Sequence, residues 1–170
     1  MAKLKEIYGS DQSKFFFKNL YLARKKQFDL VSTYVSKEDT IIDVGTTPVL
    51  DKHENFFLNH YKYPENITCF SNQDLEKLKI NFPNLKCLKG DGRRMGLKEN
   101  SYDIAMSNAT LEHVGSFENQ NKFVKELYKI SKKRCIIITP NRFYPVDFHT
   151  MLPFIHWLPK NIHRRILKLF

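Results

Sequence analysis

The chain has 170 residues, of which 42% are hydrophobic and 14% are aromatic, enough for one domain with a buried core. No apolar run approaches the roughly 20 residues that a membrane-spanning helix needs, so the sequence excludes such a helix and we expect a cytoplasmic protein. Lysine and arginine outnumber aspartate and glutamate by 28 to 18, and the formal net charge is +10.

The positive charge is spread over almost every segment rather than gathered in one tract. A solvated basic surface explains this pattern better than specific nucleic-acid binding, so we do not expect a nucleic-acid partner. Cys69, Cys87 and Cys135 stand singly inside hydrophobic segments, without the paired spacing of metal ligands. We therefore expect cysteines in the core, no disulfide and no metal site.

An amphipathic helix is predicted from about Ser13 to Tyr34, because apolar residues recur there at helical spacing. A buried strand follows at Thr40 to Val44 and ends in the turn Asp43-Val44-Gly45. Beyond the carboxyl end of a parallel strand, a glycine lets the backbone approach a ligand closely, so Asp43 and Gly45 are candidate cofactor residues. A purely structural turn, in which Asp43 caps the next element, is the alternative.

Short strands and helices then alternate along the chain. The predicted helices are Asp51–Tyr61, Asp74–Asn81 and Ser116–Lys132, and the predicted strands are Ile67–Ser71, Leu85–Leu88, Tyr102–Ser107 and Arg134–Thr139. Such alternation indicates right-handed βαβ units. The predicted fold is therefore α/β: a doubly wound, Rossmann-like parallel sheet of five strands, flanked by helices.

A turn-rich segment, Gly90 to Met95, follows the third predicted strand. A carboxylate such as Asp91 can accept a hydrogen bond from an exocyclic amine while a nearby backbone amide donates to a ring nitrogen, an arrangement that suits adenine. An ordinary turn with Asp at its first position explains the segment equally well. Its place at the same predicted sheet edge as Gly45 favours the binding interpretation.

Four segments together resemble the class I S-adenosylmethionine-dependent methyltransferases, particularly the type 11 subgroup. They are Ile-Ile-Asp-Val-Gly-Thr from Ile41, Lys-Gly-Asp-Gly-Arg-Arg from Lys89, the stretch from Asn100 to Val114 that ends in Ser-Asn-Ala-Thr-Leu-Glu-His-Val, and Ile-Ile-Ile-Thr-Pro-Asn-Arg from Ile136. The part from Asp103 to Val114 is the most specific, and the resemblance extends over about Thr40 to Pro159. It implies S-adenosylmethionine as the cofactor and methyl transfer to a small molecule or a glycan or envelope precursor.

The resemblance also implies roles for individual residues. Those matching the family's cofactor-binding positions are Asp43, Gly45, Thr46, Ser71, Asn72, Asp91, Gly92 and Asn108. Substrate candidates at or soon after strand ends are His113, Asn141, Arg142 and His149. A histidine would act as a base only if the acceptor must lose a proton, and a structural histidine is the commoner case, so no catalytic residue is assigned.

Two features depart from the family pattern. Thr46, Thr47 and Pro48 follow Gly45 where the family continues with glycines, which restricts backbone approach to a cofactor. The resemblance also implies a further helix and two strands after the fifth strand, and the sequence ends at Phe170 before them. We expect Lys160–Phe170 or a second copy of the chain to cover that sheet edge.

One methyltransferase-like domain is thus expected over residues 1–170. It consists of a helical cap (1–38), a cofactor-binding core (39–140) and an aromatic and basic extension (141–170), whose part 148–170 is a candidate for peripheral membrane contact. A non-catalytic or truncated binding module is the alternative function. A nicotinamide-binding enzyme is disfavoured, because Thr47 and Leu50 occupy the second and third glycine positions of Gly-x-Gly-x-x-Gly.

Overall fold

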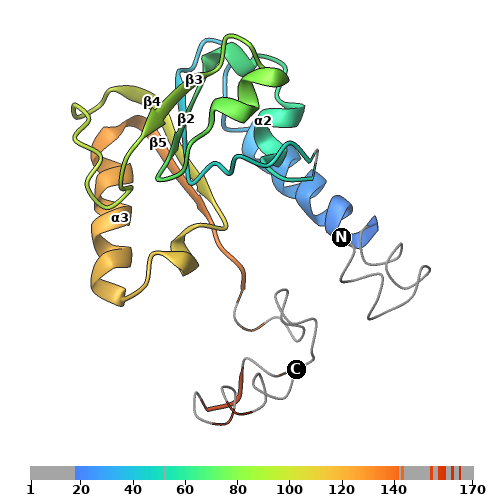
Figure 1. Ribbon diagram of the computed structural model, residues 1–170, viewed down its shortest axis with the longest axis vertical. Helices are drawn as coiled ribbons and strands as arrows, with labels where there is room; N and C mark the ends of the chain where they lie inside the picture. Colours follow the sequence, from blue (N-terminus) through green and yellow to red (C-terminus); the bar gives the residue numbers. More distant parts are fainter. Residues whose placement is uncertain are drawn as a thin grey trace. The chain divides into compact units, whose positions relative to one another are not determined.

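The computed structural model describes residues 18–51, 53–141, 143, 154, 157–159, 162 and 165. The chain divides into two compact units, Met1–Ile137 and Ile138–Phe170. The first unit contains a helix over residues 18–32 and almost all of a five-stranded sheet (Figure 1). The first part of the helix predicted from Ser13 lies outside the described residues.

The sheet has the strand order β3-β2-β1-β4-β5. Its strands are β1 (Ile41–Val44), β2 (Ile67–Ser71), β3 (Lys86–Lys89), β4 (Tyr102–Asn108) and β5 (Ser131–Ile138). Strand β1 pairs in parallel with both β2 and β4, and β2 pairs in parallel with β3. The strand order therefore reverses between β1 and β4, the kind of switch point at which α/β sheets bind ligands. The predicted α/β, Rossmann-like fold is confirmed.

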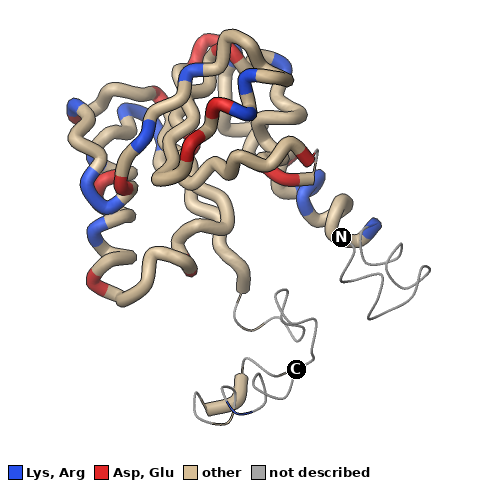
Figure 2. Tube along the Cα trace, viewed as in Figure 1, with Lys and Arg blue, Asp and Glu red and all other residues tan. Residues whose placement is uncertain are grey.

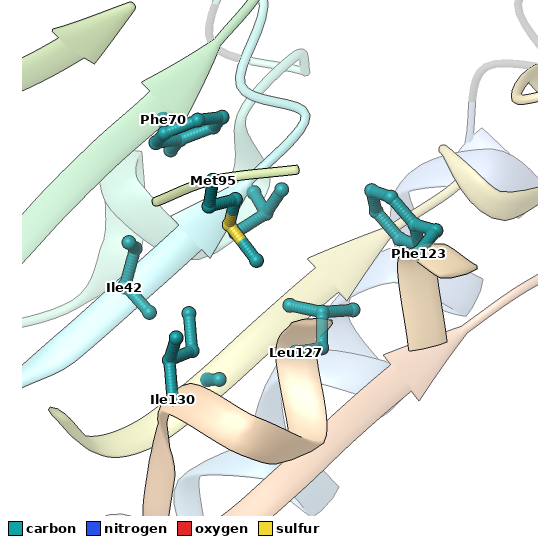
Figure 3. Packing of buried hydrophobic residues seen from close by; sticks show 8 residues of the cluster. Ile42, Phe70, Met95, Phe123, Leu127 and Ile130 are labelled. Atoms are coloured by element: carbon teal, nitrogen blue, oxygen red, sulfur yellow. The ribbon is translucent and has the colours of Figure 1, made fainter. Parts of the chain in front are cut away.

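Helix α3 (Phe117–Ile130) packs on one face of the sheet (Figure 3). Its residues Phe123, Leu127 and Ile130 follow one another at helical spacing, are fully buried, and share a core cluster with Ile42 and Phe70 of the sheet. Burying a side chain of this size stabilises the fold by roughly 1.5–3 kcal/mol. This packing holds α3 in one position on the sheet. It also holds the turn after β3, because Met95 of that turn belongs to the same cluster.

The opposite face of the sheet carries Asp43, because side chains alternate along a strand and Ile42 faces α3. Helix 18–32 and α2 (Phe56–His60) lie on this side (Figure 1). The ring of Phe28 packs against those of Phe56 and Phe57, with centroids 6.2 and 5.5 Å away. Asp43 is consequently an acidic residue on a face of the sheet that is covered by apolar side chains.

Two predicted helices differ from the observed elements. The helix expected from Asp51 begins only at Phe56, because Asn55 has left-handed backbone angles (φ 43°, ψ 44°) that no helix can continue through. The segment expected as a helix over 74–81 is a 3₁₀ helix, η2 (Glu76–Ile80), whose short length is typical of that conformation.

The boundary between α3 and β5 was also predicted wrongly, since the helix was expected to reach Lys132. Ser131 has extended backbone angles and its hydroxyl donates to the Tyr128 carbonyl at 2.8 Å, which satisfies the end of the helix. Strand β5 therefore starts at Ser131, directly after α3.

Lys and Arg alternate with Asp and Glu on several elements (Figure 2), as the spread of charge in the sequence predicts.

A charge cluster joins the amino ends of β1, β4 and β5. The Asp103 carboxylate accepts from the backbone N–H of Thr40 at 3.0 Å and from its hydroxyl at 2.9 Å. Lys133 Nζ lies 3.2 Å from Asp103 and also binds the buried carboxylate of Asp39. The Thr40 N–H above all lowers the pKa of Asp103. The stabilisation is therefore present above pH about 4 and is lost as the pH falls through the lowered pKa.

Asp103→Asn is expected to reduce the free energy of unfolding by about 1–2 kcal/mol at pH 7, because the amide keeps the shape but loses the charge-assisted hydrogen bonds. Denaturant titration at pH 7 and in acid measures the loss, which should shrink as the pH falls. Asp29→Asn is the control, since that carboxylate pairs only across one turn with exposed Lys25 and should matter little. Equal losses in both variants would contradict the assignment.

Candidate functional site

Hydrogen bonds join the carboxyl ends of β1, β2 and β4 and the turns after β1 and β3 along one edge of the sheet. Gly45 N–H donates to the Phe70 carbonyl and Gly90 N–H to the Ser71 carbonyl, both at 2.8 Å. The Ser107 hydroxyl donates to the Val44 carbonyl at 2.7 Å. The structure thus brings the predicted segments around Gly45, Ser71, Asp91 and Asn108 to the same rim.

Asp43 is the buried acidic residue at this rim, and only 7% of its surface is exposed. Burial raises the pKa of its carboxyl from 3.8 to about 6, although a hydrogen bond from Thr46 opposes the shift. The Thr46 hydroxyl also donates to the Asp43 carbonyl oxygen at 3.0 Å. A carboxylate that is poorly solvated gains strongly from a cationic partner, so Asp43 is chemically suited to a positively charged ligand.

Gly45 has a φ of 104°, which glycine adopts without strain. A Cβ atom at this position would overlap the side chain of Thr110 and lie 2.6 Å from its Cγ2. Thr110 follows β4, and its hydroxyl donates to the Asn108 carbonyl at 3.1 Å. The turn after β4 therefore lies directly against the turn after β1, and glycine at 45 is required by this contact within the protein.

The segment after Gly45 is held by the side chain of Asn55. The Asn55 Oδ1 accepts from Thr47 N–H at 3.0 Å, and its Nδ2 donates to the Thr47 carbonyl at 2.8 Å. Thr46 is itself buried, with 3% of its surface exposed. The chain thus uses a side-chain amide at the place where the family pattern has flexible glycines.

Asp91 is bound by a neighbouring arginine. Its carboxylate accepts from Arg93 Nε at 2.9 Å and Nη2 at 2.7 Å, and from the Arg93 backbone N–H at 2.9 Å. Side-chain hydrogen bonding by Arg93 is the main cause of the lowered pKa of Asp91. About half of the Asp91 side chain is exposed, and a carboxylate has about four acceptor sites, so the pair can still receive an amine donor.

The turn that carries Asp91 is fixed to α3. A Cβ atom on Gly92 would lie 2.6 Å from the ring of Phe123, so this glycine packs directly on the core. Met95 N–H donates to the Glu126 carboxylate of α3 at 2.9 Å. The adenine-binding position predicted for Asp91 and Gly92 is therefore rigidly attached to the helix that covers the sheet.

At the end of β2, Ser71 is buried and its hydroxyl accepts from Gln73 N–H at 3.2 Å, whereas Asn72 is exposed. His113 lies in the 3₁₀ helix η3 (Leu111–His113), which begins three residues after the end of β4, and its N–H donates to the Thr110 carbonyl at 2.9 Å. Of the predicted substrate residues, His113 is thus the one that follows β4 at this rim.

The other substrate candidates follow β5. Asn141 belongs to the second compact unit, where its Oδ1 accepts from Phe143 N–H at 2.9 Å. Arg142 and His149 lie outside the described residues. In the part of the chain that the structure describes, no three acidic, histidine or cysteine side chains gather where they could hold a metal ion, and no helix is long and apolar enough to cross a bilayer.

Sequence reasoning missed three residues that shape this rim, namely Asn55, Arg93 and Thr110. Arg93 could have been found, because an arginine two residues after an aspartate in a turn is well placed to pair with it. The other two act on residues eight and 65 positions earlier in the chain. No local pattern signals such contacts.

Part of the chain is similar to a known kind of domain. Residues 59–139, a little under half of the chain, match the family model described as a methyltransferase domain. No curated protein matches the chain.

Among solved structures, the chain is similar to three S-adenosylmethionine-dependent methyltransferases. One, from Thermotoga maritima, is described as a possible histamine N-methyltransferase; it is 19% identical with a TM-score of 0.51, over 81% of this chain and 60% of its own. A second, from Aquifex aeolicus, is 19% identical with a TM-score of 0.52, over 82% and 76%. The third, a TehB-like enzyme from Corynebacterium glutamicum, is 13% identical with a TM-score of 0.52, over 92% and 81%.

These likenesses in fold cover most of this chain, which itself spans 60% of the length of the Thermotoga protein. The match to the methyltransferase domain covers strands β2 to β5. Residues 59–139 are thus similar to a methyltransferase domain, and the chain has the fold of these three solved structures.

Proposed function

We propose that this chain binds S-adenosylmethionine at the rim formed by the turns after β1 to β4 and transfers its methyl group to a small molecule or to a glycan or envelope precursor. The observation that carries the proposal is the set of hydrogen bonds that join these strand ends and turns at one rim, where the poorly solvated carboxylate of Asp43 also lies. We expect this reaction in the cytoplasm.

In this proposal the cofactor's parts are divided among the turns. Asp43, Gly45 and Thr46 bind the methionine part, where the positive ammonium and sulfonium groups compensate the buried carboxylate. The ribose hydroxyls meet Ser71 and Asn72, and the adenine meets Asp91 and Gly92. Asn108, at the end of β4, faces both cofactor and acceptor.

The bound cofactor supplies a methyl group that is already activated by its sulfonium. The protein's contribution is then mainly to hold the acceptor in line with that group and to exclude water. If the acceptor must lose a proton, His113 is the candidate base among the described residues at this rim. Arg142 and His149 remain proposed acceptor contacts.

A non-catalytic binding module is the second candidate function. It is favoured by the Thr46-Thr47-Pro48 segment in place of glycines and by the contact of Thr110 with Gly45, both of which narrow the approach to the backbone. The match of residues 59–139 to a methyltransferase domain favours S-adenosylmethionine over the nicotinamide-binding alternative.

Calorimetric titration of the protein with S-adenosylmethionine and with its demethylated product tests the proposal directly. Binding of either is expected, followed by transfer of a labelled methyl group to an acceptor from a panel of small amines, including histamine, and of glycan and envelope precursors. No binding of either form would refute the proposal. Binding without transfer to any acceptor favours the non-catalytic module.

Arg93→Ala tests the adenine subsite. Losing Arg93 frees the Asp91 carboxylate to rotate and lets its pKa rise, so we expect binding of the demethylated product to weaken roughly threefold to tenfold. Arg94→Ala, at the next position in the same turn, is the control and should bind as the wild type does. An unchanged affinity in the Arg93 variant would remove Asp91 from the proposed adenine contact.

A further inference from the structure

The backbone of the segment after Gly45 is held in one conformation by hydrogen bonds from side chains. Thr46 and Pro48 cannot adopt the varied backbone angles of glycine, so one fixed shape must be selected and maintained. Thr46 is anchored through its hydroxyl to the carbonyl of Asp43 at 3.0 Å. Thr47 is held from eight residues away, by the side chain of Asn55.

The contact between Asn55 and Thr47 has two points and a defined direction. The side-chain amide of Asn55 both accepts from the Thr47 N–H and donates to the Thr47 carbonyl, and its Nδ2 also lies 3.4 Å from the Val49 carbonyl. It thereby pairs with the backbone of the segment as another peptide group would.

The backbone of Asn55 is adapted to this contact. Its φ of 43° and ψ of 44° lie in the left-handed region, which non-glycine residues enter only where the surroundings favour it and which asparagine tolerates better than most. The buried residues of α2 begin immediately afterwards, at Phe56. The left-handed turn therefore lets the chain enter the core and still direct the Asn55 amide back to Thr47.

We propose that Asn55 is a positioning residue that holds the Thr46–Pro48 segment in the shape that accepts the methionine part of S-adenosylmethionine. This inference rests on the proposed function, because it names what supports the same cofactor loop. Asn55 acts through the backbone of Thr47, so its loss changes cofactor affinity more than it changes overall stability.

Asn59 provides a matched control from the same short element. Its side-chain amide also donates to backbone carbonyls, those of Glu54 at 2.8 Å and Asn55 at 3.3 Å, and neither belongs to the loop after Gly45. Asn59→Ala therefore removes hydrogen bonds of the same kind beside the loop while leaving the contact with Thr47 intact.

The test compares Asn55→Gly with Asn59→Ala in the full chain. Glycine retains the left-handed backbone and removes only the amide, so we expect the dissociation constant for the demethylated cofactor to rise roughly tenfold in Asn55→Gly and by less than about twofold in Asn59→Ala. The thermal midpoints of the two variants should be similar. Asn55→Asp keeps the acceptor for Thr47 N–H and loses the donor, so its affinity should be intermediate; it also replaces the glycine variant if that variant fails to fold.

Affinity within about twofold of the wild type in the Asn55 variants, or equal weakening in the Asn55 and Asn59 variants, would overturn the inference. Failure of the proposed function is a separate result, since the wild-type protein itself would then not bind the cofactor or its product.

Discussion

Asp43→Asn is expected to stabilise the unliganded protein and to abolish tight binding of S-adenosylmethionine. Burial raises the pKa of this carboxyl from 3.8 to about 6. At neutral pH the ionised carboxylate therefore lowers the free energy of unfolding. An amide of the same shape removes that disadvantage, and we expect a gain of about 2 kcal/mol, or a rise in thermal midpoint of roughly 4–8 °C.

The pH dependence of this gain follows from the direction of the shift. Below the unfolded pKa of 3.8 the carboxyl is protonated in both folded and unfolded chains, and the substitution should then matter little. As the pH rises from about 4 to about 6, the unfolded chain loses this proton while the folded chain keeps it, so the stability of the wild type falls relative to the variant and stays lower above about pH 6. Thermal unfolding at pH 4 and pH 8 measures the difference.

Asp43→Asn should weaken cofactor binding, although it stabilises the unliganded protein. A cationic ligand needs the ionised carboxylate, so the affinity of the wild type should fall about tenfold for each pH unit below 6, whereas Asp43→Asn should bind weakly at every pH. Asp29→Asn, at an exposed carboxylate on helix 18–32, should show neither effect. A variant that is less stable than the wild type at pH 8, or that binds equally well, would show that Asp43 is a structural residue only.

The sequence predicts the strands of this fold better than its helices. Runs such as Ile67–Ser71 are short and contain few charged residues, because both faces of a parallel sheet are covered, and that pattern needs no tertiary information to detect. The helix carrying Phe123 and Leu127 is equally clear from its spacing. The bounds of the short helices were predicted wrongly, because single residues determine where these helices begin. The left-handed backbone of Asn55, for example, accompanies a contact with Thr47, eight residues earlier.

The candidate site also has features that the sequence predicts and features that it does not. The sequence predicts which segments meet at one rim, because parallel strands carry their turns to the same edge. It does not predict that Arg93 binds Asp91 or that Thr110 covers Gly45, since each depends on the positions of turns relative to one another. The assignments to the cofactor come from resemblance to a family and stay predictions, whereas these contacts come from the geometry of the chain itself.

Gly45→Ala should be among the most destabilising single substitutions in the chain. The added methyl group would overlap the Thr110 side chain, and the φ of 104° is one that alanine avoids. Together these effects are expected to reduce the free energy of unfolding by about 3 kcal/mol or more and to abolish cofactor binding. Denaturant titration measures the first effect and calorimetry the second.

Gly96→Ala separates the effect of steric overlap from that of backbone strain at a positive φ. Gly96 also has a positive φ, 68°, but a Cβ atom there would meet no atom within 4 Å, so only the conformational effect of about 1 kcal/mol is expected. Adding Thr110→Gly to Gly45→Ala removes the overlap and should restore most of the excess loss, although the backbone strain stays. If the double variant is no more stable than Gly45→Ala, the contact between the turns after β1 and β4 is not what requires glycine at position 45.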